Sequence, residues 1–496
     1  MINLIYKQKS ITDQINEEFK SRNYTLESPY IKINPYNFCP LSALVLFTTK
    51  NPCRISLYIE DDIVQDLKEY SRTHRLNVIG LKANFNNIIK ITCTYKTYKT
   101  ESFTFNLETS PLPEDFPKIK ILKSEDNAIL DGFYALSLTN TSGNRGKSHY
   151  ISLIDSKGNI RWYYKGISNY LFKKLNNGNF LIDASYPSEN LTKNTSPGFF
   201  EINLIGRIIN YYPIDDGFYY EPTELPNGNF LVITQSSSNK RDLVIEIDRK
   251  SRQIINRWYF NEILDTKRPA DLWLDDDPDD WIHINSVFYE EKDNSLIVCC
   301  KNQNAIVKIN KNTAEIKWIL APHYEWRDSF KEYLLSPKGN NFEWSWGPHS
   351  PIITNDGSLF VFDNGNFRSN DMDDVVLAHN NYSRAVEYII DEDAMEVEQI
   401  WQYGKESGNT LYSAQEGSID ILPNSNRLIT FGSITKDIYG NPIDDVHNPR
   451  CKKEAYIIEV SNSQEPKVIF EAIIKNNIFN PEGYICFSSK KWYISR

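Results

Sequence analysis

Hydrophobic and polar residues alternate over short segments between residues 25 and 110. The segment SFTFNLE at 102–108 has an apolar residue at every second position, and LVLFTT and CRISLYI follow the same pattern. A period of two residues is typical of a strand with one buried face. The pattern predicts a small N-terminal β-sandwich domain over residues 25–110. It ends at SPLPEDFP, where three prolines predict a stiff linker over residues 111–118.

A helical period precedes this domain, within residues 1–24. Apolar residues recur on one face of a helix that runs from Ser10 to Lys20, and Ser10 with Asp13 fits a capping box at its start. A short amphipathic helix at a terminus usually docks on its own domain. We therefore expect docking rather than a dimer contact.

Beyond the linker, one unit repeats with a period of about 50 to 70 residues. One half is a turn followed by a strand, as in LPNGNFLVI and NDGSLFVF. The other half is two strands around a polar turn, ending in an aromatic residue, as in LIDSKGNIRWYY and VKINKNTAEIKWIL. Asn-Gly and Asp-Gly are hairpin turns, so each unit supplies four antiparallel strands. The chain is therefore predicted to be all-β, with a six-bladed β-propeller over residues 119–496. The aromatic residues that end the units are expected to pack between blades: Trp162, Tyr211, Trp258, Trp318, Trp401 and Phe470.

Composition narrows the range of partners. The chain has 496 residues, a formal net charge of −10 and no long basic run, which argues against binding nucleic acid. Seven cysteines without a C-x-x-C spacing predict buried free thiols. No apolar run reaches 18 residues, so no membrane span is expected. The first residues lack the apolar stretch of a signal peptide, which predicts a cytoplasmic protein. The periplasm is the alternative if export uses another route or if the N-terminus was rebuilt.

The candidate catalytic and binding residues lie in segments where two repeat units begin and in the strand end that follows. DDWIHINSVFY carries His283 and Asn285, FEWSWGPHSPII carries His349 at the same place in the next unit, and VFDNGNFRS carries Arg368. Propellers place function at the inner ends of their strands. Two imidazoles and a guanidinium there would suit a tetrahedral oxyanion, because arginine offers a planar fork to sulfate or phosphate. A single histidine on a strand is more often structural. The inference of an oxyanion site therefore depends on the equivalent positions of His283 and His349 in neighbouring units.

Metal binding is the alternative use of the two histidines. No H-x-H or H-x-x-x-H spacing supports it. The acidic stretch DLWLDDDPDDW resembles a cation loop only loosely, and a solvated loop is expected there. We therefore expect neither a metal nor a cofactor.

Several long segments resemble the arylsulfotransferase family. They are DDWIHINSVFYEEKDNSLIVCCKNQNAIVKIN, FEWSWGPHSPIITNDGSLFVFDNGNFRS and YSRAVEYIIDEDAMEVEQIWQYGKESGNTLYS. NPYNFCPLSALVLFTTKNPCRISLYIEDD and THRLNVIGLKANFNN resemble the N-terminal domain of that family. The resemblance runs from about residue 33 to nearly the C-terminus, with the motifs in the family's order.

The resemblance implies a bacterial aryl-sulfate sulfotransferase. The family moves a sulfuryl group from a phenolic sulfate ester to a phenol, by a ping-pong route through a sulfated histidine and without a nucleotide sulfate donor. It implies that His283 and His349 are active-site histidines and that Arg368 binds the sulfuryl group. Asn285 belongs to the same motif and is implied to bind substrate in a supporting role. Family members can be dimers, so a homodimer is an expectation here.

One departure from the family concerns the covalent residue. The family's sulfated histidine is expected in the last blade, soon after YGKE, but that stretch reads GSIDILPNSNRLITFGSITKD here. His447 is the nearest later histidine, in DDVHNPR, and we count it among the catalytic candidates. His349, His283 and His379 are the other candidates. An anion-binding propeller without the nucleophile and an aryl sulfate hydrolase remain the competing functions.

Overall fold

Strands make up most of the regular elements in the part of the chain that the structure describes, so the predicted all-β class is confirmed. The computed structural model describes residues 2–493 apart from 61, 126, 141–148, 169, 186–194, 237–239, 271–278, 447, 449 and 478–480. His447 and most of the acidic stretch DLWLDDDPDDW lie outside the described residues. Across the part that is described, no helix is both long and apolar enough to cross a membrane.

The N-terminal domain is one antiparallel sheet that folds over a single core. Its strands are β1 (Tyr30–Ile33), β2 (Ser42–Ile59), β3 (Asp62–Ile79), β4 (Asn86–Tyr95) and β5 (Thr100–Glu108). The long β2 pairs with β1 through its first half and with β4 through its second half, while β3 follows it along both. The first half of β2 is buried on both faces, because Leu44 and Leu46 pack in a cluster with Ile15 of the N-terminal helix. Alternate residues of its second half and of β4, such as Leu57 and Ile91, are fully buried in the domain core. This is the half-exposed pattern that the alternation predicted.

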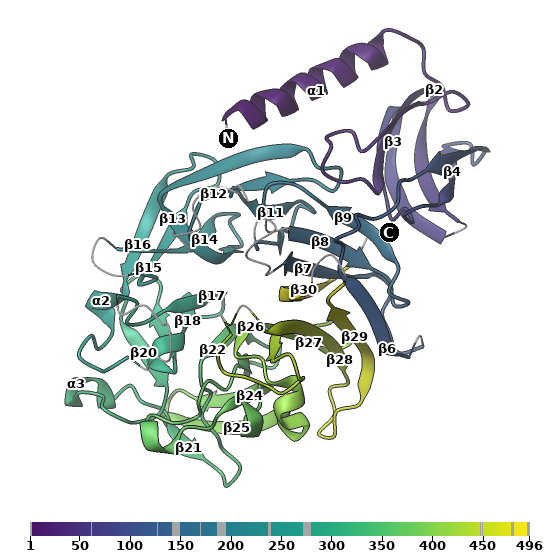
Figure 1. Cartoon of the computed structure of the whole chain (residues 1–496). Coiled ribbons are helices and arrows are strands. Elements are labelled where there is room, and N and C mark those ends of the chain that lie inside the picture. The colour runs from purple at the N-terminus through teal and green to yellow at the C-terminus, as the bar shows by residue number, and fades with distance from the viewer. Residues whose placement is uncertain are drawn as a thin grey trace.

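The N-terminal helix α1 is longer than the sequence pattern predicted. It runs from Ile2 to Lys20, so the capping box expected at Ser10 is wrong. The buried Gln8 explains the difference, because its side chain donates to Gly206 O and accepts from Ile208 N. These tertiary contacts extend the helix beyond its local start signal. Figure 1 shows α1 in purple, lying across the N-terminal domain and the nearest propeller strands.

The propeller strands pair into antiparallel units of four, which we number blade 1 to blade 6. Blade 1 contains β30 (Tyr484–Trp492), β7 (Phe133–Asn140), β8 (His149–Ile154) and β9 (Ile160–Tyr164); blade 2 contains β10 (Lys173–Lys174), β11 (Phe180–Asp183), β12 (Ser196–Ile202) and the first part of β13 (Ile208–Glu224). Blade 3 contains the rest of β13, β14 (Phe230–Thr234), β15 (Leu243–Ile247) and β16 (Ile254–Tyr259); blade 4 contains β17 (Ile284–Glu290), β18 (Ser295–Cys300), β19 (Ala305–Asn310) and β20 (Ile316–Leu320). Blade 5 contains β22 (Pro348–Ile353), β23 (Leu359–Asp363), β24 (Arg384–Asp391) and β25 (Glu396–Tyr403), with β21 (Ser336–Lys338) at its edge. Blade 6 contains β26 (Gln415–Ile421), β27 (Arg427–Lys436), β28 (Lys452–Val460) and β29 (Val468–Lys475), with β6 (Lys118–Ser124) at its edge.

The two ends of the propeller segment close the ring. The C-terminal strand β30 pairs with β7 as the innermost strand of blade 1, and β6 pairs with β29 at the outer edge of blade 6. Figure 1 shows the yellow β30 beside the blue β7. The proline-rich linker is part of this closure, because Tyr150 and Tyr484 both donate to Asp115.

Most of the aromatic residues that end the units pack between blades, as predicted. The indole N–H groups of Trp162, Trp258, Trp318 and Trp401 donate to Leu204 O, Lys311 O, Glu392 Oε1 and Ser463 O of the following blade, at 2.7 to 3.0 Å. Phe470 stacks on Tyr134 of blade 1 with ring centroids 4.0 Å apart. Tyr211 differs, because it packs on Phe200 of its own blade. Neighbouring strand residues point to opposite faces, so Tyr212 fills that position instead and contacts Phe230 of blade 3.

Candidate active site

The innermost strands of blades 3 to 5 are irregular at the same level. Tyr220 of β13, His283 just before β17 and Ser350 of β22 have φ angles of 59°, 50° and 59°, and the strand register shifts beside each of them. Left-handed backbone is uncommon for such residues, and bulges of this kind re-aim side chains next to functional sites. The repeated irregularity brings His283 and His349 towards the same tyrosine.

His283 is the centre of a polar chain across blades 3 and 4. Its Nδ1 lies 2.7 Å from the buried carboxylate of Asp280, which is also paired with Arg241. Its Nε2 lies 2.5 Å from the hydroxyl of Tyr220. Because Asp280 can only accept at Nδ1, the proton of a neutral His283 belongs on Nδ1, and Nε2 accepts from Tyr220.

The electrostatics of this chain keep the imidazole neutral. Burial, followed by the Arg241 guanidinium 3.1 Å from Nδ1, lowers the pKa of His283 to about 4. Burial alone would raise the pKa of Asp280, but His283 and Arg241 outweigh it and lower that pKa. At neutral pH Asp280 is therefore a carboxylate that orients an uncharged His283.

His349 is the second residue of β22, the innermost strand of blade 5. Its ring lies edge-on to Tyr220, with centroids 5.9 Å apart. Its Nδ1 is buried and has no hydrogen-bond partner among the described residues. Burial lowers the pKa of His349 to about 4, although the Gly417 backbone works in the other direction. His349 is therefore a second neutral imidazole, and no side-chain hydrogen bond holds its ring within the described chain.

Asn285 and Ser286 hold blade 5 against blade 4. The Asn285 amide donates to Pro348 O at 2.8 Å, and its carbonyl oxygen accepts from Ser286 Oγ. Ser286 Oγ in turn accepts from Ser350 N at 3.0 Å. The two residues thus bracket His349 and fix its position relative to His283. Binding of substrate by Asn285 stays a prediction.

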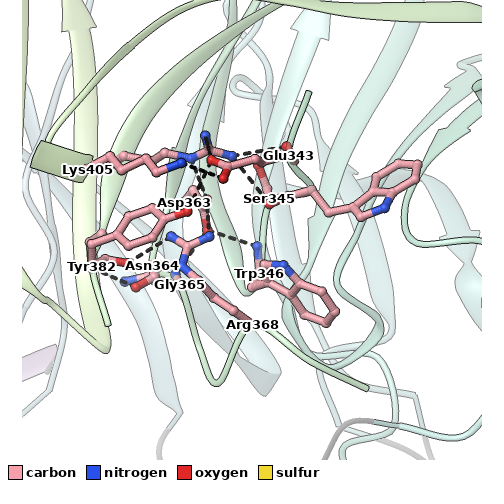
Figure 2. Close-up of polar contacts among 12 residues, drawn as sticks. Glu343, Ser345, Trp346, Asp363, Asn364, Gly365, Arg368, Tyr382 and Lys405 are labelled. Atoms are coloured by element: carbon pink, nitrogen blue, oxygen red, sulfur yellow. Dashed lines mark hydrogen bonds and ion pairs between the residues drawn. The ribbon is translucent and has the colours of Figure 1, made fainter. Parts of the chain in front are cut away.

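Arg368 lies in the loop after β23, beside the strand pair that contains His349. Its Nη1 is 3.2 Å from Asp363 Oδ2, its Nε donates to Asn381 Oδ1, and its Nη2 donates to Tyr382 O. The guanidinium also lies 3.6 Å from the centroid of the Tyr382 ring (Figure 2). The backbone of Asp363 pairs with that of Pro348, the residue before His349. A guanidinium has five N–H groups, and these contacts use three of them.

The anchor of Arg368 continues into a larger charged network. Asp363 is fully buried and also accepts from Arg384 Nε at 2.9 Å. Arg384 is bound to Glu343, which pairs with Lys405 at 2.5 Å. Glu343 and Lys405 line a pocket of about 870 Å³. Figure 2 shows Glu343 and Lys405 on one side of Asp363 and Arg368 on the other. The network fixes the Arg368 fork rigidly.

Glu416 lies in blade 6, directly before the stretch in which the sequence lacks the expected histidine. It lies in β26 with a φ of 54°, directly before Gly417 at the His349 ring. Burial raises the pKa of Glu416 to about 8, against a smaller opposing effect of Lys453. At neutral pH this side chain is a protonated carboxylic acid.

The other sequence candidates lie apart from this cluster. His379 is exposed in a short turn between β23 and β24, and its backbone carbonyl accepts from Asn409. His447 is among the residues that the structure does not describe. Sequence reasoning missed Tyr220 and Arg241, which no motif marks in a chain with 30 tyrosines. Asp280 could have been found, because it lies three residues before His283.

Two family models match this chain, one over the N-terminal domain and one over the propeller. The family model described as arylsulfotransferase (ASST) matches residues 118–484, and the model of the arylsulfotransferase Ig-like domain matches residues 30–110. Arylsulfate sulfotransferase AssT of Escherichia coli O6:H1 is 27% identical over 347 residues, which cover 56% of this chain and 57% of that protein. The protein of the same name from Lelliottia amnigena is 28% identical over 358 residues, covering 58% of each. The match thus spans less than two thirds of these curated relatives. Because the first family model matches well over half of the length of this chain, the chain belongs to the arylsulfotransferase family.

Proposed function

We propose that this protein transfers a sulfuryl group from a phenolic sulfate ester to a phenolic acceptor. The observation that carries the proposal is the approach of two neutral histidines, His283 and His349, to Tyr220. Arg368 lies in the loop after β23 of the same blade as His349. Neutral imidazoles can act as nucleophile or base, and a guanidinium matches the oxygens of a sulfuryl group. The names of the two relatives support the same substrate class.

The transfer proceeds in two steps through a sulfated histidine and needs no nucleotide sulfate donor. His349 is the best placed of the described histidines, because both ring nitrogens of His283 are engaged by Asp280 and Tyr220. A sulfated imidazole is labile, whereas a serine or threonine sulfate would be too stable to pass the group on. His447 stays a candidate from the sequence.

Incubation with 4-nitrophenyl sulfate, with and without phenol, tests this function. We expect nitrophenol release in steady state only when phenol is present, because the sulfated enzyme needs an acceptor to turn over. Sustained release without phenol would instead identify a hydrolase. An absence of release under both conditions would favour the anion-binding propeller that lacks the nucleophile.

Replacing Arg368 with alanine should lower kcat/KM by about 100-fold, the cost of losing one donor to a developing oxyanion. Arg368→Lys should recover little, because the planar fork that binds Asp363 and Asn381 is lost. The matched control is Arg252→Ala, which removes an exposed guanidinium from a turn of blade 3. A wild-type rate in Arg368→Ala would remove Arg368 from the site.

A further inference from the structure

Tyr220 is the residue that joins the two histidines. Its hydroxyl lies 2.5 Å from His283 Nε2, and its ring centroid lies 6.0 Å from the His283 ring and 5.9 Å from the His349 ring. The side chain is only partly buried, so part of it is open to solvent. We propose that Tyr220 is a catalytic residue, whose phenol passes one proton between His283 and the phenolic oxygen of the substrate. This role rests on the proposed sulfuryl transfer.

The direction of the hydrogen bonds supports this role. Asp280 takes the Nδ1 proton of His283, which leaves the Nε2 lone pair for the Tyr220 hydroxyl. Asp280 would also stabilise the imidazolium that forms when Nε2 gains a proton. Arg241 pairs with the same oxygen of Asp280 that contacts His283, so the guanidinium keeps that oxygen beside the ring. The hydrogen bonds therefore all donate in one direction, from Tyr220 to His283 and from His283 to Asp280. Tyr220 is the end of this series that would meet the substrate.

The chemistry of the side chain matches that of the substrates. A tyrosine is itself a phenol, so proton exchange with a phenolic acceptor or leaving group is nearly balanced. The backbone supports the same conclusion, because Tyr220 has a φ of 59° within a shift of the β13 register. Such strain in a bulky residue persists where the surrounding structure enforces it, and it clusters at active sites.

The proton balance closes over the two half-reactions. When the acceptor attacks, its oxygen forms a bond to sulfur and the histidine N–S bond breaks, with the electron pair returning to nitrogen. The acceptor proton moves to Tyr220 Oη as the Tyr220 proton moves to His283 Nε2. In the next donor half-reaction the proton left on His283 Nε2 returns through Tyr220 to the departing aryl oxide, while the histidine N–S bond forms and the donor O–S bond breaks. In the first turnover His283 takes that proton from water.

The test compares Tyr220→Phe on donors with different leaving groups. The variant keeps the ring against His349 and removes only the hydroxyl. We expect a loss of about 10² to 10⁴ in rate with phenyl sulfate, and of about 10-fold or less with 4-nitrophenyl sulfate, whose leaving group needs little protonation. Tyr220→Phe/His283→Gln should lose little more than the worse single variant, because the two residues act as one unit.

Tyr289→Phe is the matched control, because it removes a hydroxyl that donates to Asn294 at 3.0 Å, in the turn between β17 and β18. Equal losses of Tyr220→Phe on both donors, or an unchanged rate, would overturn the proton role. A sulfuryl adduct mapped to Tyr220 would overturn it as well, since the phenol would then be the carrier. An inactive wild-type protein would overturn the proposed function, and this role with it.

Discussion

Replacing His349 with glutamine is expected to reduce sulfuryl transfer by a factor on the order of 10⁵, as loss of a nucleophile does in other covalent enzymes. Glutamine can occupy the space at the start of β22, and the contacts of Asn285 and Ser286 to the backbone do not depend on the ring. The rate should therefore fall without a change of fold. Mass spectrometry after mixing with an aryl sulfate alone should find an adduct of about 80 Da, the mass of SO₃ replacing a proton, in the wild-type protein only.

The exposed His379 provides the control for that experiment, and His379→Gln should keep both the rate and the adduct. Peptide mapping decides between the candidates. An adduct that persists in His349→Gln, or one that maps to His447, would show that another histidine carries the group.

Replacing Glu416 with glutamine should stabilise the protein, and the gain should grow with pH. The pKa of Glu416 is raised from 4.5 to about 8, so the folded state keeps the proton over a range in which the unfolded state has lost it. The free energy of unfolding of the wild type thus falls as pH rises from 4.5 to 8, by up to about 1.4 kcal/mol per pH unit. Because Glu416 is partly accessible, we expect the variant to be about 2 to 4 kcal/mol more stable at pH 8.5, and nearly equal to wild type at pH 4.5.

Urea unfolding at several pH values measures this difference. The matched control is Glu465→Gln, which removes an exposed carboxylate from blade 6 and should show no such dependence on pH. A stability difference that stays constant with pH would mean that Glu416 is already ionised in the folded protein. An acid such as Glu416 that lowers the stability of the folded protein is expected to be kept when it serves a function.

Periodic features of this fold could be predicted from the sequence. Alternation predicted the half-exposed strands, and the aromatic ends of the repeats predicted the indole contacts between blades. Predictions failed where a distant contact decides the outcome. Gln8 lengthens α1 through Gly206, almost 200 residues away, and Tyr211 exchanges its expected role with Tyr212 because one residue reverses the face of a strand.

In the candidate site, too, local motifs could be found from the sequence and distant contacts could not. His283, His349 and Arg368 stand in motifs, so residue type and position indicated them. Tyr220 and Arg241 enter the site only because β13 is bent and blade 3 lies beside blade 4, and neither property has a local pattern. Glu416 could not be predicted from the sequence for another reason, because the burial that raises its pKa arises only when the blades assemble.

The pairing of β30 with β7 has a consequence for the order in which this protein is made. β7 ends at Asn140 and its partner begins at Tyr484, so the ribosome adds more than 300 residues between the two. At about 5 to 20 residues per second, β7 waits on the order of 20 to 70 seconds with its inner edge unpaired. An apolar strand with a bare edge is a template for joining other chains. The nascent chain therefore depends on transient cover for β7 until the last strand arrives, and a ribosome that stalls before Tyr484 releases a product prone to aggregate.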